Sequence, residues 1–345
     1  MRGSRAALGL ASILLVASCA EGPEGEGARL LVASGFTDQV FVLDPESGAV
    51  LDSVAIRGRP FARDEPHGIA VAPEGDRWYL TLAHGEPELQ VFERPGHRLI
   101  GALRLPMGGA ARIGLTPDGR IAFVPDYGRS AGDEPGEVAR IRTRTLEITH
   151  QVRVCPAPHD ARVDPTGELV LVACAFGSEV VLLSAVDLSE LGRVSIGEGM
   201  MPMPMNVAWS PDGRRAWVTL MGGDRVVEID REGTLVQSVD AGPQPTSILA
   251  TPDGRRLLVT NRQGRSLAIF RLPGLELERE VAMGDAPHPQ GIAIDPTGRH
   301  AWVSYEGEVG GMGGVVAIEI DSGEVLWRTP VGAFVLGVAW APALP

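Results

Sequence analysis

Three of the seven histidines in this chain stand just before apolar segments that lead into proline-containing turns. His67 and His159 each lie six residues before a turn proline, Met205 and Gln290 hold the same position before two other turns, and His288 lies two residues upstream of Gln290. Imidazole and thioether groups are suitable ligands for copper or haem iron. If these side chains converge they would form a ligand-binding site, with His67, His159 and Met205 as the metal ligands and copper or another metal as the cofactor.

The same pattern also has a purely structural explanation. The residue just before this position is proline in five of seven cases: Pro66, Pro158, Pro204, Pro245 and Pro289. A histidine here could therefore hydrogen-bond the backbone of a recurring turn and bind nothing.

Two cysteines remain after residue 19, Cys155 and Cys174. In an oxidising compartment two such thiols pair by default, and we predict a disulfide between the first two strands of one repeat, worth about 3 kcal/mol in the chain-entropy model. The segment CPAPH also places a cysteine and a histidine four residues apart. A metal site of Cys155, His159 and Cys174, or two free thiols, are the alternatives.

Residues 200–205 read MMPMPM. Several thioethers in one loop could bind copper(I), because soft ligands select it. They could equally form an adaptable apolar lip on a binding site.

A repeated turn must position all of these groups. The pattern x-Pro-x-Gly, exemplified by Thr251–Gly254, recurs with its prolines at 73, 117, 165, 211, 252 and 296, and a degenerate form occurs at Pro342. The steps are 44, 48, 46, 41, 44 and 46 residues. A period of about 40–50 residues with several short strands per repeat indicates a β-propeller.

Each repeat predicts four strands. In order they are an innermost strand such as Gly68–Val71, a second such as Trp78–Leu82, a third with in-out alternation such as Val226–Asp230, and a polar outer strand such as Thr234–Val239.

The ends of the folded region complement one another. Segments 30–33, 40–43 and 50–56 predict three strands of a repeat that lacks its innermost strand. Segment 336–340 predicts an innermost strand that has no further strands after it. We therefore predict an all-β, seven-bladed β-propeller over residues 28–345, closed by the C-terminal strand joining the N-terminal blade, which removes open sheet edges.

These residues resemble a known family. SPDGRRAWVTL (210–220), TPDGRRLLVTN (251–261) and DPTGRHAWVSY (295–305), together with Pro66–Ala70, are similar to the YVTN-repeat family of seven-bladed propellers, over nearly all of 28–342. Related propellers include lactonases, a streptogramin lyase and haem-d1-binding domains. The resemblance implies the fold, but it does not assign a reaction.

The charge pattern argues against nucleic acid as a partner. The 345 residues contain 31 basic and 44 acidic side chains, giving a net charge of −13, and every basic residue is arginine. No basic cluster stands out, so phosphate-backbone binding is not expected. A monomer that binds a small molecule or a periplasmic or surface protein is the expectation.

The N-terminal residues have the features of an export signal. Arg2 and Arg5 precede an apolar stretch, 6–16, that is too short to span a bilayer. Small residues then lead into Cys19, as in a bacterial lipobox. We predict a signal peptide over 1–18, lipidation of Cys19, and a flexible tether over 19–27, with the chain anchored in the cell envelope, at the outer membrane. An ordinary signal peptide that happens to contain a cysteine is the alternative.

Two functions remain open. The first is a lipid-anchored binding module that uses the central funnel for a ligand, metal or protein. The second is a lactonase- or lyase-type enzyme at the same place. No nucleophile elbow, HExxH or EF-hand pattern occurs in the sequence, so an enzyme would need acid and base groups that converge in space.

The anchor can be tested directly. Cys19→Ser should release the protein from the membrane or leave it as uncleaved precursor, because no thiol remains to carry the lipid. Fractionation with detergent-free washing checks this result. A Cys19→Ser protein that stays on the membrane would place the anchor elsewhere.

Overall fold

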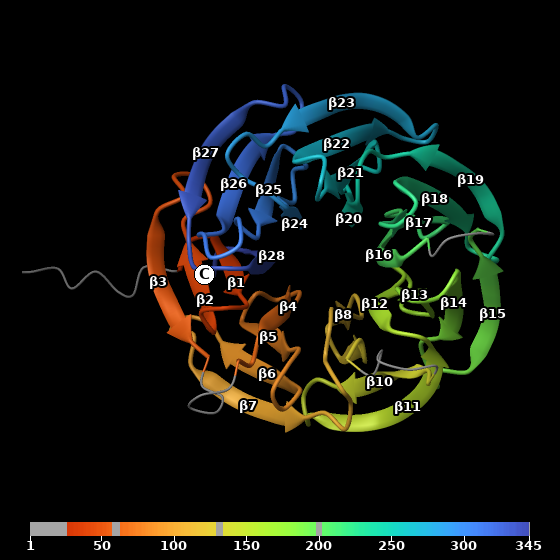
Figure 1. Ribbon diagram of the computed structural model, residues 1–345. Coiled ribbons are helices and arrows are strands. Elements are labelled where there is room, and N and C mark those ends of the chain that lie inside the picture. Colours follow the sequence, from red (N-terminus) through yellow and green to blue (C-terminus); the bar gives the residue numbers. More distant parts are fainter. Residues whose placement is uncertain (1–25, 57–62, 129–133, 198–201, 345) are drawn as a thin grey trace, which may run out of the picture.

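The computed structural model describes residues 26–56, 63–128, 134–197 and 202–344. Within these ranges the regular structure is entirely β, in seven antiparallel four-stranded sheets arranged radially about one axis (Figure 1). The predicted seven-bladed propeller is confirmed. In the same ranges, no helix has the length and apolar character needed to cross a bilayer.

Each blade contributes one strand to each of four concentric positions. The innermost strands are β28 (Val335–Ala341), β4 (Pro66–Val71), β8 (Gly114–Leu115), β12 (Pro158–Val163), β16 (Pro204–Trp209), β20 (Pro245–Ala250) and β24 (Pro289–Ile294). The second strands are β1 (Arg29–Ser34), β5 (Arg77–Leu82), β9 (Ile121–Pro125), β13 (Leu169–Cys174), β17 (Arg215–Leu220), β21 (Arg256–Asn261) and β25 (His300–Tyr305).

The third strands are β2 (Gln39–Leu43), β6 (Glu88–Glu93), β10 (Gly136–Arg142), β14 (Glu179–Ser184), β18 (Arg225–Asp230), β22 (Ser266–Arg271) and β26 (Gly314–Glu319). The outer strands are β3 (Val50–Ala55), β7 (Leu99–Arg104), β11 (Glu147–Cys155), β15 (Glu190–Ser195), β19 (Leu235–Asp240), β23 (Glu276–Ala282) and β27 (Val325–Pro330).

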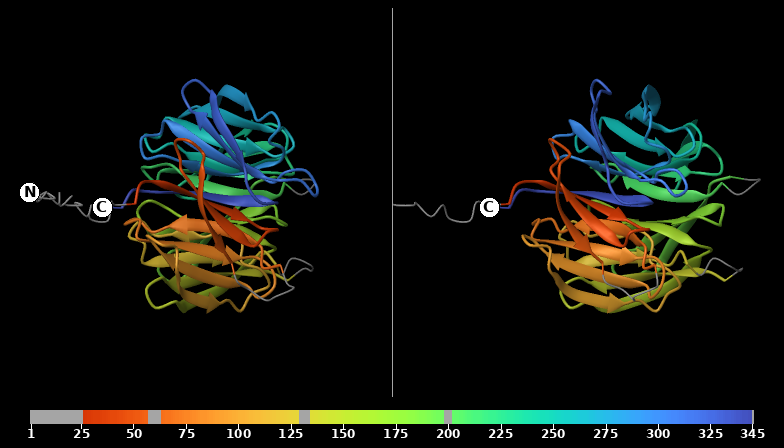
Figure 2. Two further views of the ribbon diagram at one scale, coloured as in Figure 1. Left: turned by 90° about the vertical axis from the view of Figure 1, so that its left-hand side faces the viewer. Right: turned by 60° about the vertical axis from the view of Figure 1, so that its left-hand side comes forward.

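Ring closure follows the prediction. Strand β28 pairs with β1 in the sheet β28-β1-β2-β3, with Arg29 opposite Ala341. Both ends of the fold therefore lie at the face that carries the proline turns, where the Leu344 N–H donates to the Glu26 carbonyl at 2.6 Å. Figure 2 shows the first described residues (red) and the end of the C-terminal strand (blue) at this one face of the ring. The starts of the inner strands, with the histidines, lie at the opposite face.

Burial corrects one expectation. The third strands do not alternate: in β18 the residues from Val226 to Ile229 are all buried, including Glu228. Both faces of such a strand pack against neighbouring blades, so it has no solvent side. Alternation belongs to the outer strands, as in β27, where exposed and half-buried residues follow each other.

The disulfide is confirmed, but it joins two blades and does not lie within one. Cys155 ends β11 of the third blade and Cys174 ends β13 of the fourth, with an S–S distance of 2.08 Å. The outer strand continues as far as Cys155, which the turn pattern did not reveal. Because the sulfurs are bonded to each other, the alternatives of a metal site with His159 and of free thiols are wrong.

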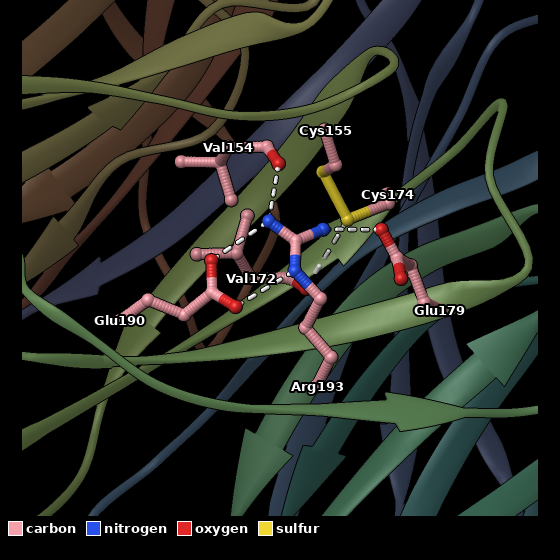
Figure 3. The surroundings of a disulfide bond; sticks show 7 residues. All are labelled: Val154, Cys155, Val172, Cys174, Glu179, Glu190 and Arg193. Carbon is pink, nitrogen blue, oxygen red and sulfur yellow. Dashed lines mark hydrogen bonds and ion pairs between the residues drawn. A yellow bond between two sulfur atoms is a disulfide. The ribbon is translucent and has the colours of Figure 1, made fainter.

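A second link reinforces the same boundary. Arg193 of β15 donates from Nη2 to the Val154 carbonyl of β11 at 3.0 Å and pairs with Glu190 and Glu179 (Figure 3). The third and fourth blades are thus tied both covalently and by a charged side chain.

The start of each inner strand has a recurring backbone conformation. The residue two before the shared histidine position has a positive φ in six of seven blades: Glu65 (51°), Ala157 (49°), Met203 (52°), Gln244 (55°), His288 (56°) and Phe334 (55°). Such left-handed non-glycine residues are uncommon. In these six blades the same backbone bend therefore precedes the inner strand.

A hydroxyl group bridges neighbouring inner strands just after this bend. The Thr219 Oγ1 accepts the Asn206 N–H at 3.1 Å and donates to the Thr246 carbonyl of the next blade at 2.8 Å. Thr260 bridges Ser247 to the Gln290 carbonyl, and Ser304 bridges Gly291 to the Leu336 carbonyl, in the same way. Thr81 forms the fourth such bridge, from Gly68 to the Ala111 carbonyl. We call these contacts the hydroxyl bridges.

The hydroxyl bridges should contribute measurably to stability. Thr219→Val keeps the side-chain volume but leaves the buried Asn206 N–H without a partner. The Thr246 carbonyl loses one of its two donors and keeps the Asn206 Nδ2, so the free energy of unfolding should fall by about 1–3 kcal/mol. Urea unfolding measures the change. Thr234→Val, at an exposed turn position, is the control and should stay within about 0.5 kcal/mol; equal effects of the two substitutions would contradict a role for the bridge.

Candidate functional site

The structure brings His67 and His159 together. Their ring centroids are 5.8 Å apart and the planes are nearly perpendicular, at 78°. His67 is the second residue of β4 in the second blade and His159 the second residue of β12 in the fourth, so the two imidazoles come from blades that are not neighbours.

The intervening third blade explains this closeness. Its residue at the shared position is Ala111, and its inner strand β8 has only two residues. A Cβ added to Gly68 would lie 2.7 Å from the Ala111 carbonyl, and the Arg112 N–H reaches the His159 carbonyl at 3.4 Å. The backbone at Ala111 and Arg112 packs between the inner strands of the second and fourth blades, and the side chain of Ala111 ends at Cβ. The imidazoles of His67 and His159 can therefore approach each other.

His159 is held as a neutral imidazole. It is 5% exposed, and its Nδ1 lies 2.9 Å from the Met205 carbonyl. Since a carbonyl only accepts, Nδ1 carries the proton and Nε2 keeps a free lone pair. Burial, helped by the nearby His67 and Arg112, lowers the pKa of His159 from 6.5 to about 3, although the hydrogen bond to Met205 opposes this shift.

His67 is oriented by a carboxylate. Its Nδ1 lies 3.4 Å from Oε1 of Glu65, whose Oε2 pairs with Nε2 of His84 at 3.2 Å. Glu65 is only 8% exposed and occupies the bend position before Pro66. Glu65 is not among the site residues predicted from the sequence, although its position two residues before His67 is a signal that the sequence contains.

Tyr127 completes this group. It follows β9, and its ring meets the edge of His159 at 5.0 Å between centroids. Burial raises the pKa of the Tyr127 hydroxyl, and the charge of Glu65 adds to the effect. Its loop is held by Asp126, whose Oδ1 accepts N–H groups from Gly108 and Gly109 at 2.9 Å. We define the mouth cluster as Glu65, His67, His84, Tyr127 and His159.

Met205 contributes its backbone to this cluster. Its side chain is 7% exposed and packs with Ala157 and Ala175, next to Tyr127. This packing fits the apolar-lip interpretation of the methionine run. Met200 and Met201 lie outside the described residues.

Gln290 and His288 belong to a different arrangement. Gln290 donates to Glu306, which forms a two-pronged pair with Arg262 at 2.8 and 2.7 Å. This pairing raises the pKa of Arg262. His288 holds a bend position, and its Nδ1 lies 3.2 Å from the Gly307 carbonyl. Both residues therefore fasten the Glu306 loop of the seventh blade.

The structure adds no metal ligands to those predicted from the sequence, within the residues that it describes. In the described ranges, no three or more His, Cys, Asp or Glu residues are grouped so that they could hold a metal ion. Copper on His67, His159 and Met205 stays a prediction.

The neutral state of His159 makes stability depend on pH. The folded-state pKa of His159 is depressed, so its contribution to the free energy of unfolding is complete above about pH 6.5. This contribution is lost as the pH falls toward 3, because the unfolded chain takes up the proton first. Between these pH values the free energy of unfolding falls by about 1.4 kcal/mol per pH unit.

Wild-type protein should therefore lose about 2–3 kcal/mol more than His159→Gln between pH 6 and pH 4. Urea unfolding at several pH values gives the comparison. Parallel pH profiles for the two proteins would show that His159 titrates normally.

Comparison with known proteins supports the fold. No family model matches the chain. It is 29% identical over 277 residues to a 6-phosphogluconolactonase of Yersinia enterocolitica, covering 71% of this chain and 77% of that protein. A periplasmic gluconolactonase of Pseudomonas aeruginosa superposes with a TM-score of 0.73 at 21% identity, covering 92% and 99% of the two chains.

A candidate 6-phosphogluconolactonase of Bacteroides fragilis superposes with a TM-score of 0.69 at 15% identity, covering 91% of this chain and 98% of that one. At these identities the solved structures establish the fold alone. The chain is a seven-bladed β-propeller whose structural neighbours include propellers of the 6-phosphogluconolactonase type.

Proposed function

We propose that this protein hydrolyses a sugar lactone at the mouth cluster. The observation that carries the proposal is the pairing of a carboxylate-oriented imidazole, His67 with Glu65, with a second imidazole, His159, that stays neutral. Relatives named for lactone hydrolysis support the substrate class.

His67 is the general base in this proposal. With Glu65 accepting the Nδ1 proton, the Nε2 lone pair can take a proton from a water molecule as that water attacks the lactone carbonyl carbon. The bond from the acyl carbon to the ring oxygen then breaks, and the ring oxygen receives the proton from His67. The product is the open-chain hydroxy acid, and no other reactant is required.

His159 has a different role because it cannot act as an acid near neutral pH. Its Nε2 lone pair accepts a hydrogen bond from the attacking water or from a substrate hydroxyl. Tyr127 packs against its ring edge and keeps the imidazole in place. Orientation of this kind reduces the entropy lost in reaching the transition state.

We also propose that Cys19 anchors the chain to the membrane, with the outer membrane as its place. The chain joins the propeller beside the C-terminal strand, where Glu26 pairs with Arg94 at 3.3 Å and with His97 at 3.6 Å. That is the turn face. An anchor attached there would direct the mouth cluster away from the bilayer, toward diffusing substrate.

Substitution of the base tests the reaction. His67→Gln should lower kcat for glucono-δ-lactone by about 10²–10⁴-fold, since general-base catalysis contributes that much, and Glu65→Gln should have a smaller effect. The assay is acid release at constant pH, corrected for spontaneous hydrolysis. His150→Gln, an exposed histidine on β11, is the matched control.

Two results would contradict the proposal in different ways. If wild-type protein binds lactones saturably without accelerating hydrolysis, the mouth cluster belongs to a binding module. If His67→Gln and His150→Gln retain equal activity, catalysis occurs elsewhere.

A further inference from the structure

The central channel holds a cavity of about 280 Å³ below the mouth cluster. Its lining comes from six inner strands and from Arg112, which precedes β8. It extends from the level of Arg112 to Val163, Trp209 and Leu249, close to the turn face. The cavity is therefore distinct from the mouth cluster and extends toward the other side of the ring.

Arg112 crosses this channel. Its Nη2 donates to the Ser247 hydroxyl at 3.1 Å, which links the third blade to the sixth. Burial lowers the pKa of Arg112 to about 10, while the charge of Asp160 counteracts the effect. The guanidinium remains charged at neutral pH.

The charges around the cavity leave one positive charge in excess. Arg162 donates from Nη2 to Oδ2 of Asp160 at 3.3 Å, and the same oxygen accepts the Val207 N–H at 3.0 Å. Oδ1 of Asp160 lies 3.2 Å from Arg162 Nη2 as an ion pair, but it has no hydrogen-bond donor. Two guanidinium groups and one fully buried carboxylate thus face the same space.

Buried polar atoms here lack hydrogen-bond partners. Arg112 Nε is a donor without an acceptor, and Asn206 Oδ1 is an acceptor without a donor. Asn206 is 3% exposed, and its Nδ2 donates to the Thr246 carbonyl at 2.7 Å, which leaves Oδ1 as its unused atom. Unsatisfied buried groups are rare and call for an explanation.

The repeat does not require these side chains. At the same position the first, second and seventh blades carry glycine (Gly337, Gly68 and Gly291), whereas the third to sixth carry Arg112, Asp160, Asn206 and Ser247. An inner strand forms with glycine at this position, so the fold does not require a polar side chain there. The four polar residues lie on neighbouring blades, on one side of the channel.

We propose that this cavity binds a small hydroxycarboxylate. The carboxylate would pair with Arg112 and Arg162, because guanidinium groups match its geometry. A hydroxyl would donate to Asn206 Oδ1. The volume corresponds to roughly nine water molecules at ~30 Å³ each, which limits the ligand to about ten non-hydrogen atoms. This site does not depend on lactone hydrolysis at the mouth.

Calorimetric titration of the intact protein with L-malate and glycerate tests the proposal, with succinate and sulfate for comparison. Malate should bind about 10-fold more tightly than succinate, which lacks the hydroxyl, and more tightly than sulfate. Arg162→Gln should weaken malate binding about 10–100-fold, as expected for a lost charge-assisted bond. Arg162→Lys should recover part of this loss.

His67→Gln should leave malate affinity unchanged, which separates this site from the mouth cluster. Urea unfolding verifies that each variant is folded. The proposal is overturned if neither malate nor glycerate binds, if sulfate and succinate bind as well as malate, or if His67→Gln weakens malate binding as much as Arg162→Gln does.

Discussion

The hydroxyl bridge between neighbouring inner strands is the contact on which the rest of this propeller depends. In six of the seven blades the inner strand follows a left-handed residue, and the pairing with the second strand shifts register just beyond it, as between Pro204 and Val207. That shift frees an N–H, and a threonine or serine eight residues after the turn proline accepts it while donating to the next blade. One hydroxyl therefore satisfies two buried backbone groups and sets the spacing of the blades.

The bridge is missing from three blades, the first, third and fourth, where the equivalent residues Ala33, Pro125 and Ala173 have no hydroxyl. The third and fourth of these blades contribute His159, Arg112 and Asp160 to the candidate sites. There other links replace the bridge: the Cys155–Cys174 disulfide, and the Asp160 carboxylate that accepts an N–H from the fifth blade. With the constraint relaxed, the third blade carries a short inner strand, His159 approaches His67, and Arg112 enters the channel. Functional sites are where departures from a repeat are expected.

The repeat made the fold predictable from the sequence. Turn prolines, strand order and closure by β28 could all be inferred, because each blade uses the same local chemistry. The disulfide was predicted, but its position between blades was not, since it depends on how far β11 extends. The buried third strand β18 contradicts the predicted in-out alternation, because both of its faces pack against neighbouring blades.

The sites were less predictable because they depend on departures from the repeat. His67 and His159 were identified by position, yet their contact depends on the small side chain of Ala111 and the shortness of β8. Gln290 and His288 lie at or near the same repeat position, but in the structure they hydrogen-bond Glu306 and the Gly307 carbonyl of the loop in the seventh blade. Glu65 and Arg112 were missed, because a bend residue and a channel arginine show their role only when the ring is assembled.

The central claim is that the mouth cluster receives the substrate. A crystal structure of the protein soaked with the hydroxy acid formed from glucono-δ-lactone tests it most directly. The account predicts ligand oxygens within hydrogen-bond distance of Nε2 of both His67 and His159. A product molecule bound elsewhere, with both Nε2 atoms contacting only solvent, would contradict it.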